Sequence, residues 1–265
     1  MRHLKLSTTL AALTLGATAA SAQTPAPDSW IVTVKANGVV GPAYPGSKDF
    51  GVIAYPSFSL RRASTPATFS APDDNISFAL FDQGWIKAGP SGRFIGQRKA
   101  ADHRELTGIH DVDWTLEGGA FLEVWPMQNL RARVDLRHAF NGHNGLVGDL
   151  ALDFVQPLGA WTVSVGPRAS FGDASYARAY YGVTAAEALA NGRVTAFNPS
   201  GGITSVGVTA AASYTFSPQW TATGYVRYDN LVGSAGRSPI VKTLGTESQF
   251  TFGLKLAYSF TTSGF

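Results

Sequence analysis

The densest group of ionisable side chains in this 265-residue chain lies between residues 110 and 137. Its first members, His110, Asp111 and Asp113, suggest one kind of chemistry, because a histidine beside carboxylates can activate water for hydrolysis. Most of the remaining charges lie at odd-numbered positions, as expected for one face of a β-strand, whose side chains alternate. The residues expected to form one charge network are Asp113, Glu117, Glu123, Arg131, Arg133, Asp135 and Arg137.

A structural role explains this network better than catalysis does. If Val124 pairs with Leu130 across a turn, Glu123 lies opposite Arg131, and Glu117 lies opposite Arg137 six residues further on. Charges inside a narrow protein interior need partners of opposite sign, so we interpret the set as ion pairs that fill the interior. A hydrolytic site would need its acid and base at the rim, where only the residues around His110 lie.

No other motif carries a convincing reaction. No serine occupies a G-x-S-x-G turn or lies next to a histidine. The pair His138 and His143 is interpreted as a solvated loop pair rather than as metal ligands. The pairs Gly118-Gly119 and Gly201-Gly202 lack the Lys-Ser of a phosphate loop. We therefore expect no catalytic, metal-binding or cofactor-binding residue, and no enzyme.

The elements that position the charges are predicted to be strands of a transmembrane barrel. From residue 130 the even positions are Leu130, Ala132, Val134 and Leu136, and the odd positions between them are charged. Similar alternation recurs at 161–171, 206–216 and 248–260. The apolar faces are free of charge and long enough to cross a bilayer when tilted, which favours an antiparallel barrel whose apolar side meets lipid.

Eleven segments show strand character, namely 30–39, 50–60, 75–81, 85–95, 111–124, 130–140, 146–156, 161–171, 203–216, 220–231 and 248–260. Bacterial barrels usually have an even number of strands, so we predict a further strand at 175–183 and about 12 in total, with 10 as the alternative. A short helical turn is expected at 185–190. Tight links near residues 127, 158 and 218 fit the periplasmic side, and the longer links 172–202 and 232–247 then face outward.

The N-terminus has the layout of a secretory signal peptide. A basic start precedes an apolar stretch, and Ala20-Ser21-Ala22 offers a cleavage site, so residues 1–22 are predicted to be removed and residues 23–265 to form the barrel. Arg2 and Lys5 leave with the leader, so the mature chain is close to neutral and no basic run suggests nucleic acid. The expected location is the outer membrane of a Gram-negative cell, in contact with its lipid.

The last predicted strand alternates Phe252, Leu254, Leu256, Tyr258 and Phe260 with small or polar residues. Its closing Tyr-x-Phe is similar to the C-terminal signal of outer-membrane barrels, although residues 261–265 follow it. Together with segments elsewhere in the sequence, this strand resembles the MipA/OmpV family of outer-membrane proteins. The segments that carry the resemblance are 41–47 (GPAYPGS), 106–113 (LTGIHDVD), 180–183 (YYGV), 197–202 (FNPSGG), 238–241 (SPIV) and 257–260 (AYSF).

This resemblance implies a scaffold or interaction protein linked to peptidoglycan-remodelling enzymes. Its implied partners are a lytic transglycosylase and a peptidoglycan synthase, and the family offers no catalytic residues to carry over. The alternatives are a small pore, which the predicted interior charges would suit, and a surface adhesin.

Overall fold

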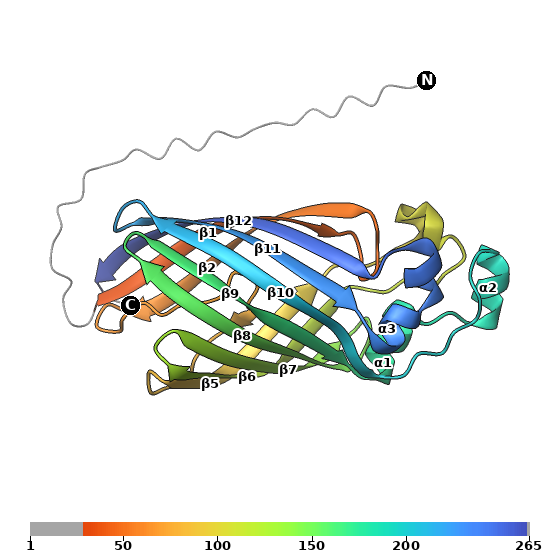
Figure 1. Ribbon diagram of the computed structural model, residues 1–265, viewed down its shortest axis with the longest axis horizontal. Helices are drawn as coiled ribbons and strands as arrows, with labels where there is room; N and C mark the ends of the chain where they lie inside the picture. The colour runs from red at the N-terminus through yellow and green to blue at the C-terminus, as the bar shows by residue number, and fades with distance from the viewer. Residues whose placement is uncertain (1–28, 264–265) are drawn as a thin grey trace, which may run out of the picture.

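The computed structural model describes residues 29–263, and the predicted leader therefore lies outside the described residues. One antiparallel sheet dominates and curls about a central interior (Figure 1). Its strands are β1 (Ser29–Pro42), β2 (Phe50–Arg62), β3 (Ile76–Ser77), β4 (Phe81–Asp82), β5 (Ile86–Ile95), β6 (Thr115–Met127), β7 (Leu130–Phe140), β8 (Leu146–Leu158), β9 (Trp161–Gly172), β10 (Gly202–Thr215), β11 (Trp220–Leu231) and β12 (Ser248–Ser263).

The strand order confirms the predicted sheet of 12 strands. It runs β2-β1-β12-β11-β10-β9-β8-β7-β6-β5-β3, and β4 also pairs with β5. The first and last strands meet, since Trp30 of β1 lies opposite Thr262 of β12. Each remaining long strand pairs with its neighbour in sequence, as hairpins with short links require.

The two faces of the sheet have opposite character, as strand β7 illustrates. Val134 and Leu136 point outward and are 37% and 52% exposed, whereas Arg131 and Arg137 point inward and are 0% and 1% exposed. A water-soluble sandwich would bury the apolar face instead. Apolar side chains outside and charges inside are the pattern of a transmembrane barrel, so the predicted orientation of both faces is confirmed.

Aromatic rings form a row on the outer face near the tight links. Trp161 contacts Tyr214 with 4.7 Å between ring centroids, and Trp220 contacts Tyr258 at 4.8 Å. Phe216 lies between these pairs, 6.4 Å from Trp220. Trp and Tyr rings at this level suit a bilayer interface, because they have an apolar body and a polar edge. We call this the short-turn end; the start of β1 and the end of β12 lie there too (Figure 1), where Ser29 is opposite Ser263.

The strand predicted at 75–81 forms only in part, as the short strands β3 and β4, and the segment before it enters the interior of the barrel. Strand β2 ends at the short-turn end, where Arg62 is opposite Trp30, and β3 begins further up the wall, where Ile76 is opposite Gly92. Residues 63–75 connect these points through the interior. We call them the inner segment. Within the described residues, β2 and β3 do not pair with each other, so the sheet keeps a seam instead of the full closure expected from the sequence.

The helices gather at the other end, which we call the cap end (Figure 1). They are η1 (Ala100–Asp102), η2 (Arg104–Leu106), α1 (Ala174–Tyr181), α2 (Ala185–Asn191), α3 (Gly233–Arg237) and η3 (Ile240–Leu244). The helical turn predicted at 185–190 is confirmed by α2. The strand predicted at 175–183 is wrong, because this segment is α1. Among the described residues, no helix is both long and apolar enough to cross a bilayer.

Local capping explains why 174–181 is helical. The carboxylate of Asp173 accepts hydrogen bonds from the backbone N–H groups of Ser175 and Tyr176, which begins the helix. Ala177, Tyr180 and Tyr181 are then buried on one helix face. Two apolar clusters hold the cap together. The first consists of Tyr44, Leu106, Ile109, Val183, Val194, Ile240 and Leu244. The second consists of Val112, Tyr180, Tyr181, Leu231, Ala235 and Val241.

Candidate functional site

The most organised polar site is an ion-pair network in the barrel interior, with Arg131 at its centre. The Arg131 guanidinium donates to Glu123 at 2.9 Å, to Asp153 at 2.8 Å and to Asp74 at 2.6 Å. Three carboxylates thus surround one fully buried cation. Such a cluster is stable only when its charges are all paired, because taking them out of water is costly.

A second cluster lies nearer the cap end, around Arg137 of β7. Arg137 Nε donates to Glu117 Oε2 at 2.9 Å, and Nη2 donates to Asp149 Oδ2 at 2.6 Å. The other oxygen of Glu117 is 3.2 Å from His143 Nε2. Between the clusters, Arg133 Nε donates to Asp135 Oδ2 at 2.7 Å.

The inner segment joins this network to the opposite wall. Its Asp73 accepts hydrogen bonds from Arg168 at 2.9 Å, from Arg227 at 3.2 Å and from Thr209 at 2.8 Å. Arg168 also donates to Asp153 at 2.7 Å, which links strands β8, β9, β10 and β11 through two carboxylates. These contacts explain why residues 63–75 lie inside instead of filling the seam.

Six of the seven residues expected in the network take part in it. The exception is Asp113, which is exposed in the loop before β6. The expected register is wrong by two residues, because Val124 pairs with Ala132 and an irregularity follows before Met127 pairs with Leu130. The ion pairs Glu123–Arg131 and Glu117–Arg137 nevertheless form, since long side chains reach a diagonal neighbour.

Several members of the network were not on the predicted list, namely Asp73, Asp74, Asp149, Asp153, Arg168 and Arg227. Asp149 and Asp153 could have been found, because they share the inward face of β8 with Ala151. The aspartates of the inner segment lie outside any alternating pattern.

His110, which was weighed as a rim base and set aside, makes all of its side-chain contacts within the cap. Its Nδ1 lies 2.7 Å from Glu187 Oε1, and its Nε2 lies 2.9 Å from the carbonyl oxygen of Ala179. Both neighbours are hydrogen-bond acceptors, so the two ring nitrogens are occupied by contacts within the cap. Asp111 accepts from the backbone N–H of Ala100 at 2.7 Å. Neither ring nitrogen is directed at a free water site.

Glu187 is held in its ionised form by its surroundings. Partial burial raises the pKa of its carboxyl, but hydrogen bonds from Thr184 and His110 outweigh this effect and bring it to about 2. The pair borders a pocket of about 400 Å³ at the cap, next to Arg178 and Phe197. The contacts of His110 and Glu187 tie the loop before β6 to helices α1 and α2.

The two histidines weighed as a metal pair point to different places. His138 lies on the outward face of β7 with its ring 5.7 Å from that of Phe140, whereas His143 is buried against Glu117. Across residues 29–263, no group of three or more His, Asp or Glu side chains has the geometry to hold a metal ion.

The cap covers the network from outside. The ring of His143 packs against Tyr176 and Tyr180 of α1 at 5.0 and 5.9 Å. Buried Arg98 donates to the carbonyl oxygen of Tyr180 at 3.0 Å, and Ser238 donates to that of Tyr181 at 2.7 Å. Helix α1 is therefore fixed over the cap end of the interior by both backbone and ring contacts.

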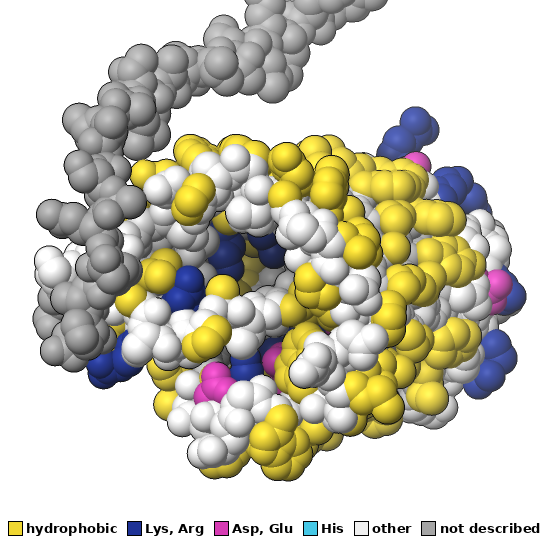
Figure 2. Space-filling model, turned by 60° about the vertical axis from the view of Figure 1, so that its left-hand side comes forward, with side chains coloured by type: hydrophobic (Ala, Val, Ile, Leu, Met, Phe, Trp, Pro, Cys, Tyr) yellow, Lys and Arg dark blue, Asp and Glu magenta, His cyan; other side chains and the backbone are white. Residues whose placement is uncertain are grey.

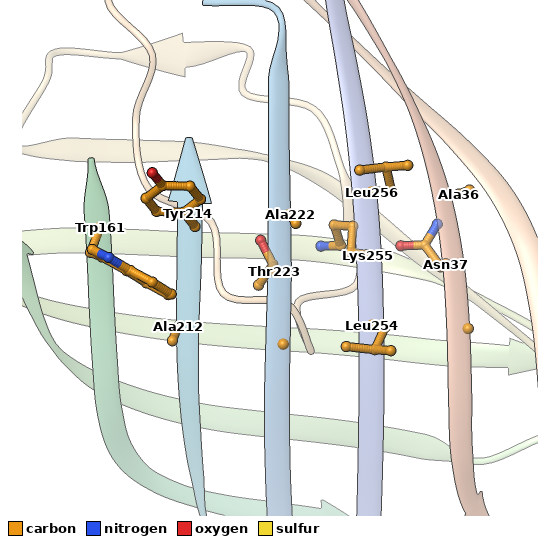
Figure 3. A pocket seen from close by; sticks show the side chains of 12 residues that line it. Ala36, Asn37, Trp161, Ala212, Tyr214, Ala222, Thr223, Leu254, Lys255 and Leu256 are labelled. Atoms are coloured by element: carbon orange, nitrogen blue, oxygen red, sulfur yellow. The ribbon is translucent and has the colours of Figure 1, made fainter. Parts of the chain in front are cut away.

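A shallow depression of about 570 Å³ lies on the outer face of the wall, over β10, β11, β12 and β1 (Figure 3). Its outward-facing lining consists of small residues such as Ala36, Ala212 and Ala222, with Trp161 and Tyr214 at the border, while Asn37, Thr223 and Lys255 line it from the inward face. The register of these strands directs the outward-facing side chains toward lipid. Acyl chains therefore suffice to fill the depression in a membrane.

Comparisons with known proteins were made for the whole chain. The model of the family described as "MltA-interacting protein MipA" matches residues 34–260. No curated protein matches the sequence. Similar solved structures include the COG4313 outer membrane channel from Pseudomonas putida F1, at 13% identity and a TM-score of 0.43 over 92% of this chain and 100% of that one.

A loop L8 deletion mutant of OmpT, an outer membrane protein of Vibrio cholerae, is 8% identical, with a TM-score of 0.38 over 87% of this chain and 98% of that one. Likeness at this level carries no functional argument. The family match covers nearly all of the described barrel, and the apolar belt around a charged interior agrees with it. The chain is thus an outer-membrane β-barrel protein that belongs to the MipA family.

Proposed function

We propose that this protein is a non-catalytic scaffold of the outer membrane, which holds a lytic transglycosylase, and with it a peptidoglycan synthase, close to the barrel. The family description, which names a protein that interacts with MltA, supports the choice of the first partner. The resemblance noted in the sequence supports the second.

The observation that carries the proposal is the packed cap over an ion-paired interior. Leu106 and Ile240 of the cap are both 0% exposed, and Arg131 below it is equally buried. A barrel whose interior is crossed by ion pairs and covered at one end is better suited to anchoring than to transport. Its binding surface is then the short-turn end, which the lengths of the links assign to the periplasm.

Site-specific photocrosslinking in cells tests this assignment. A photoreactive residue replaces Gln128 or Gln219, which are exposed in two tight links, and Leu189, which is 85% exposed on the cap, is the matched control position. We expect a murein hydrolase to be captured from the two short-turn positions and not from position 189. Capture from neither position, or equally from all three, contradicts the proposal.

A small pore is the second candidate, because the interior of the barrel is rich in charge. Conductance across planar bilayers separates the two functions. The scaffold predicts at most rare and small openings, whereas a steady conductance of the unmodified protein would favour the pore.

A further inference from the structure

The interior has a second sector, formed by β1, β2 and β12, whose charges are not balanced. These three adjacent strands contain no aspartate or glutamate, yet they carry the inward-facing lysines Lys35 and Lys255. Within the described residues, neither ammonium group has an ion pair or a hydrogen bond. By contrast, Arg131, Arg137 and Arg168 all bind carboxylates.

The two lysines form a pair. Asn37 lies opposite Lys255 and Lys35 lies opposite Ala257, so the lysines occupy diagonal positions on the same inward face. This register brings two like charges to one face, and the carboxylates of Asp73 and Asp74, which attract Lys255, are already bound by arginines. A ligand with two negative charges would relieve this repulsion.

An aromatic surface lies beside the pair. Tyr225 of β11 is opposite Gly253 of β12, and a Cβ atom at residue 253 would overlap the tyrosine ring. The ring therefore occupies the space that a side chain at residue 253 would fill. Residue 253 is two positions before Lys255 on the same face of β12. Tyr55 of β2, 46% exposed, lies opposite Asn37 and therefore faces the same side.

This sector is reached from the short-turn end. Figure 2 shows an opening at that end, with Lys and Arg side chains visible inside it. Lys35 is half-buried near the middle of β1. A dissolved molecule can therefore approach the lysine pair from the end opposite to the cap, through water.

We propose that the sector of β1, β2, β11 and β12 binds a soluble organic phosphate, with the phosphate between Lys35 and Lys255 and the apolar part on the ring of Tyr225. A phosphate monoester carries up to two negative charges near neutral pH, which matches two lysines. Lysine binds phosphate as a mobile point charge and needs no fixed fork geometry. This inference goes beyond the scaffold function and does not depend on it.

The test uses the purified full-length protein in nonionic detergent, with phenyl phosphate as the probe and titration calorimetry as the measurement. We expect the double variant Lys35→Gln/Lys255→Gln to bind at least roughly tenfold more weakly, because each lost charged hydrogen bond is worth about a factor of ten or more. Lys242→Gln, which removes an exposed lysine of the cap, is the control and should bind like the unmodified protein.

A second variant tests the aromatic part. Gly253→Ala pushes the ring of Tyr225 aside, so it should weaken phenyl phosphate binding several-fold while leaving binding of inorganic phosphate unchanged. The heat-dependent gel mobility of each variant reports whether its barrel is intact. Absence of phenyl phosphate binding to the unmodified protein, or equal affinity of the folded double variant, would overturn the proposal.

Discussion

Arg131 in the barrel and Leu106 in the cap are both 0% exposed, yet different kinds of interaction stabilise them. Arg131 contacts three carboxylates, whereas Leu106 packs in an apolar cluster with Tyr44 and Ile109. The apolar side chains of the barrel strands face lipid, so the clusters of buried apolar side chains lie in the cap. Its interior must be specified by charge instead.

This difference has a consequence for mutation. An apolar cluster loses stability in proportion to the volume removed, and its neighbours can partly collapse. An ion-pair cluster cannot adapt in this way, because removal of one cation leaves like charges facing each other. The barrel interior should therefore respond more strongly to a single substitution than the cap does.

The largest expected effect is that of Arg131→Met. The substitution leaves Glu123 and Asp74 buried without this cation, so we expect a loss of about 3–5 kcal/mol in the free energy of unfolding. Urea titration of the barrel in detergent, followed by gel mobility, measures it. Arg193→Met, which removes an exposed arginine of the cap, should leave the transition within about 0.5 kcal/mol. Equal transitions for both variants would show that the network is not structural.

A smaller and more local effect is expected for Leu106→Ala. The cavity should destabilise the cap by about 2–5 kcal/mol without unfolding the barrel, because the apolar clusters lie at the cap end only. Hydrogen exchange should accelerate in 98–112 and 174–197, while amides of β7 keep their protection. Leu189→Ala, at a side chain 85% exposed, is the matched control. Faster exchange throughout β7 would mean that cap and barrel are one cooperative unit.

The sequence could predict the faces of the strands but not all of their pairings. Alternation in 130–140 separates inward Arg131 from outward Leu136 without any knowledge of neighbours. The register between β6 and β7 depends on the irregularity near Pro126, which has no N–H to donate to the partner strand. A count of residues from the turn could not include this shift.

Two segments show what strand periodicity alone misses. In 174–181 the buried residues Ala177, Tyr180 and Tyr181 follow a helical spacing, and Asp173 is a suitable N-cap, so this helix could have been found. The inner segment has no periodic signal. Its path depends on Asp73 and Asp74 meeting arginines that are distant in sequence, which only the folded barrel brings together.

The third and smallest effect concerns the pH dependence of the cap, through Glu187. The folded-state pKa of about 2 lies below the ordinary value of 4.5, so this carboxylate stabilises the cap above pH 4.5, and the contribution is lost as the pH falls from there toward 2. Glu187→Gln removes the ionisation.

The cap of the unmodified protein should consequently be better protected than that of the Glu187→Gln variant at pH 6, and the difference should vanish toward pH 2. Hydrogen exchange of 174–197, corrected for the intrinsic rate at each pH, gives the comparison. Asp102→Asn changes an exposed carboxylate of the same cap and should produce no such difference. The difference between Glu187→Gln and the unmodified protein could instead stay constant from pH 6 to 2. Hydrogen bonding, and not charge, would then tie His110 to α2. In that case the cap would not share the dependence on charge that holds the barrel interior together.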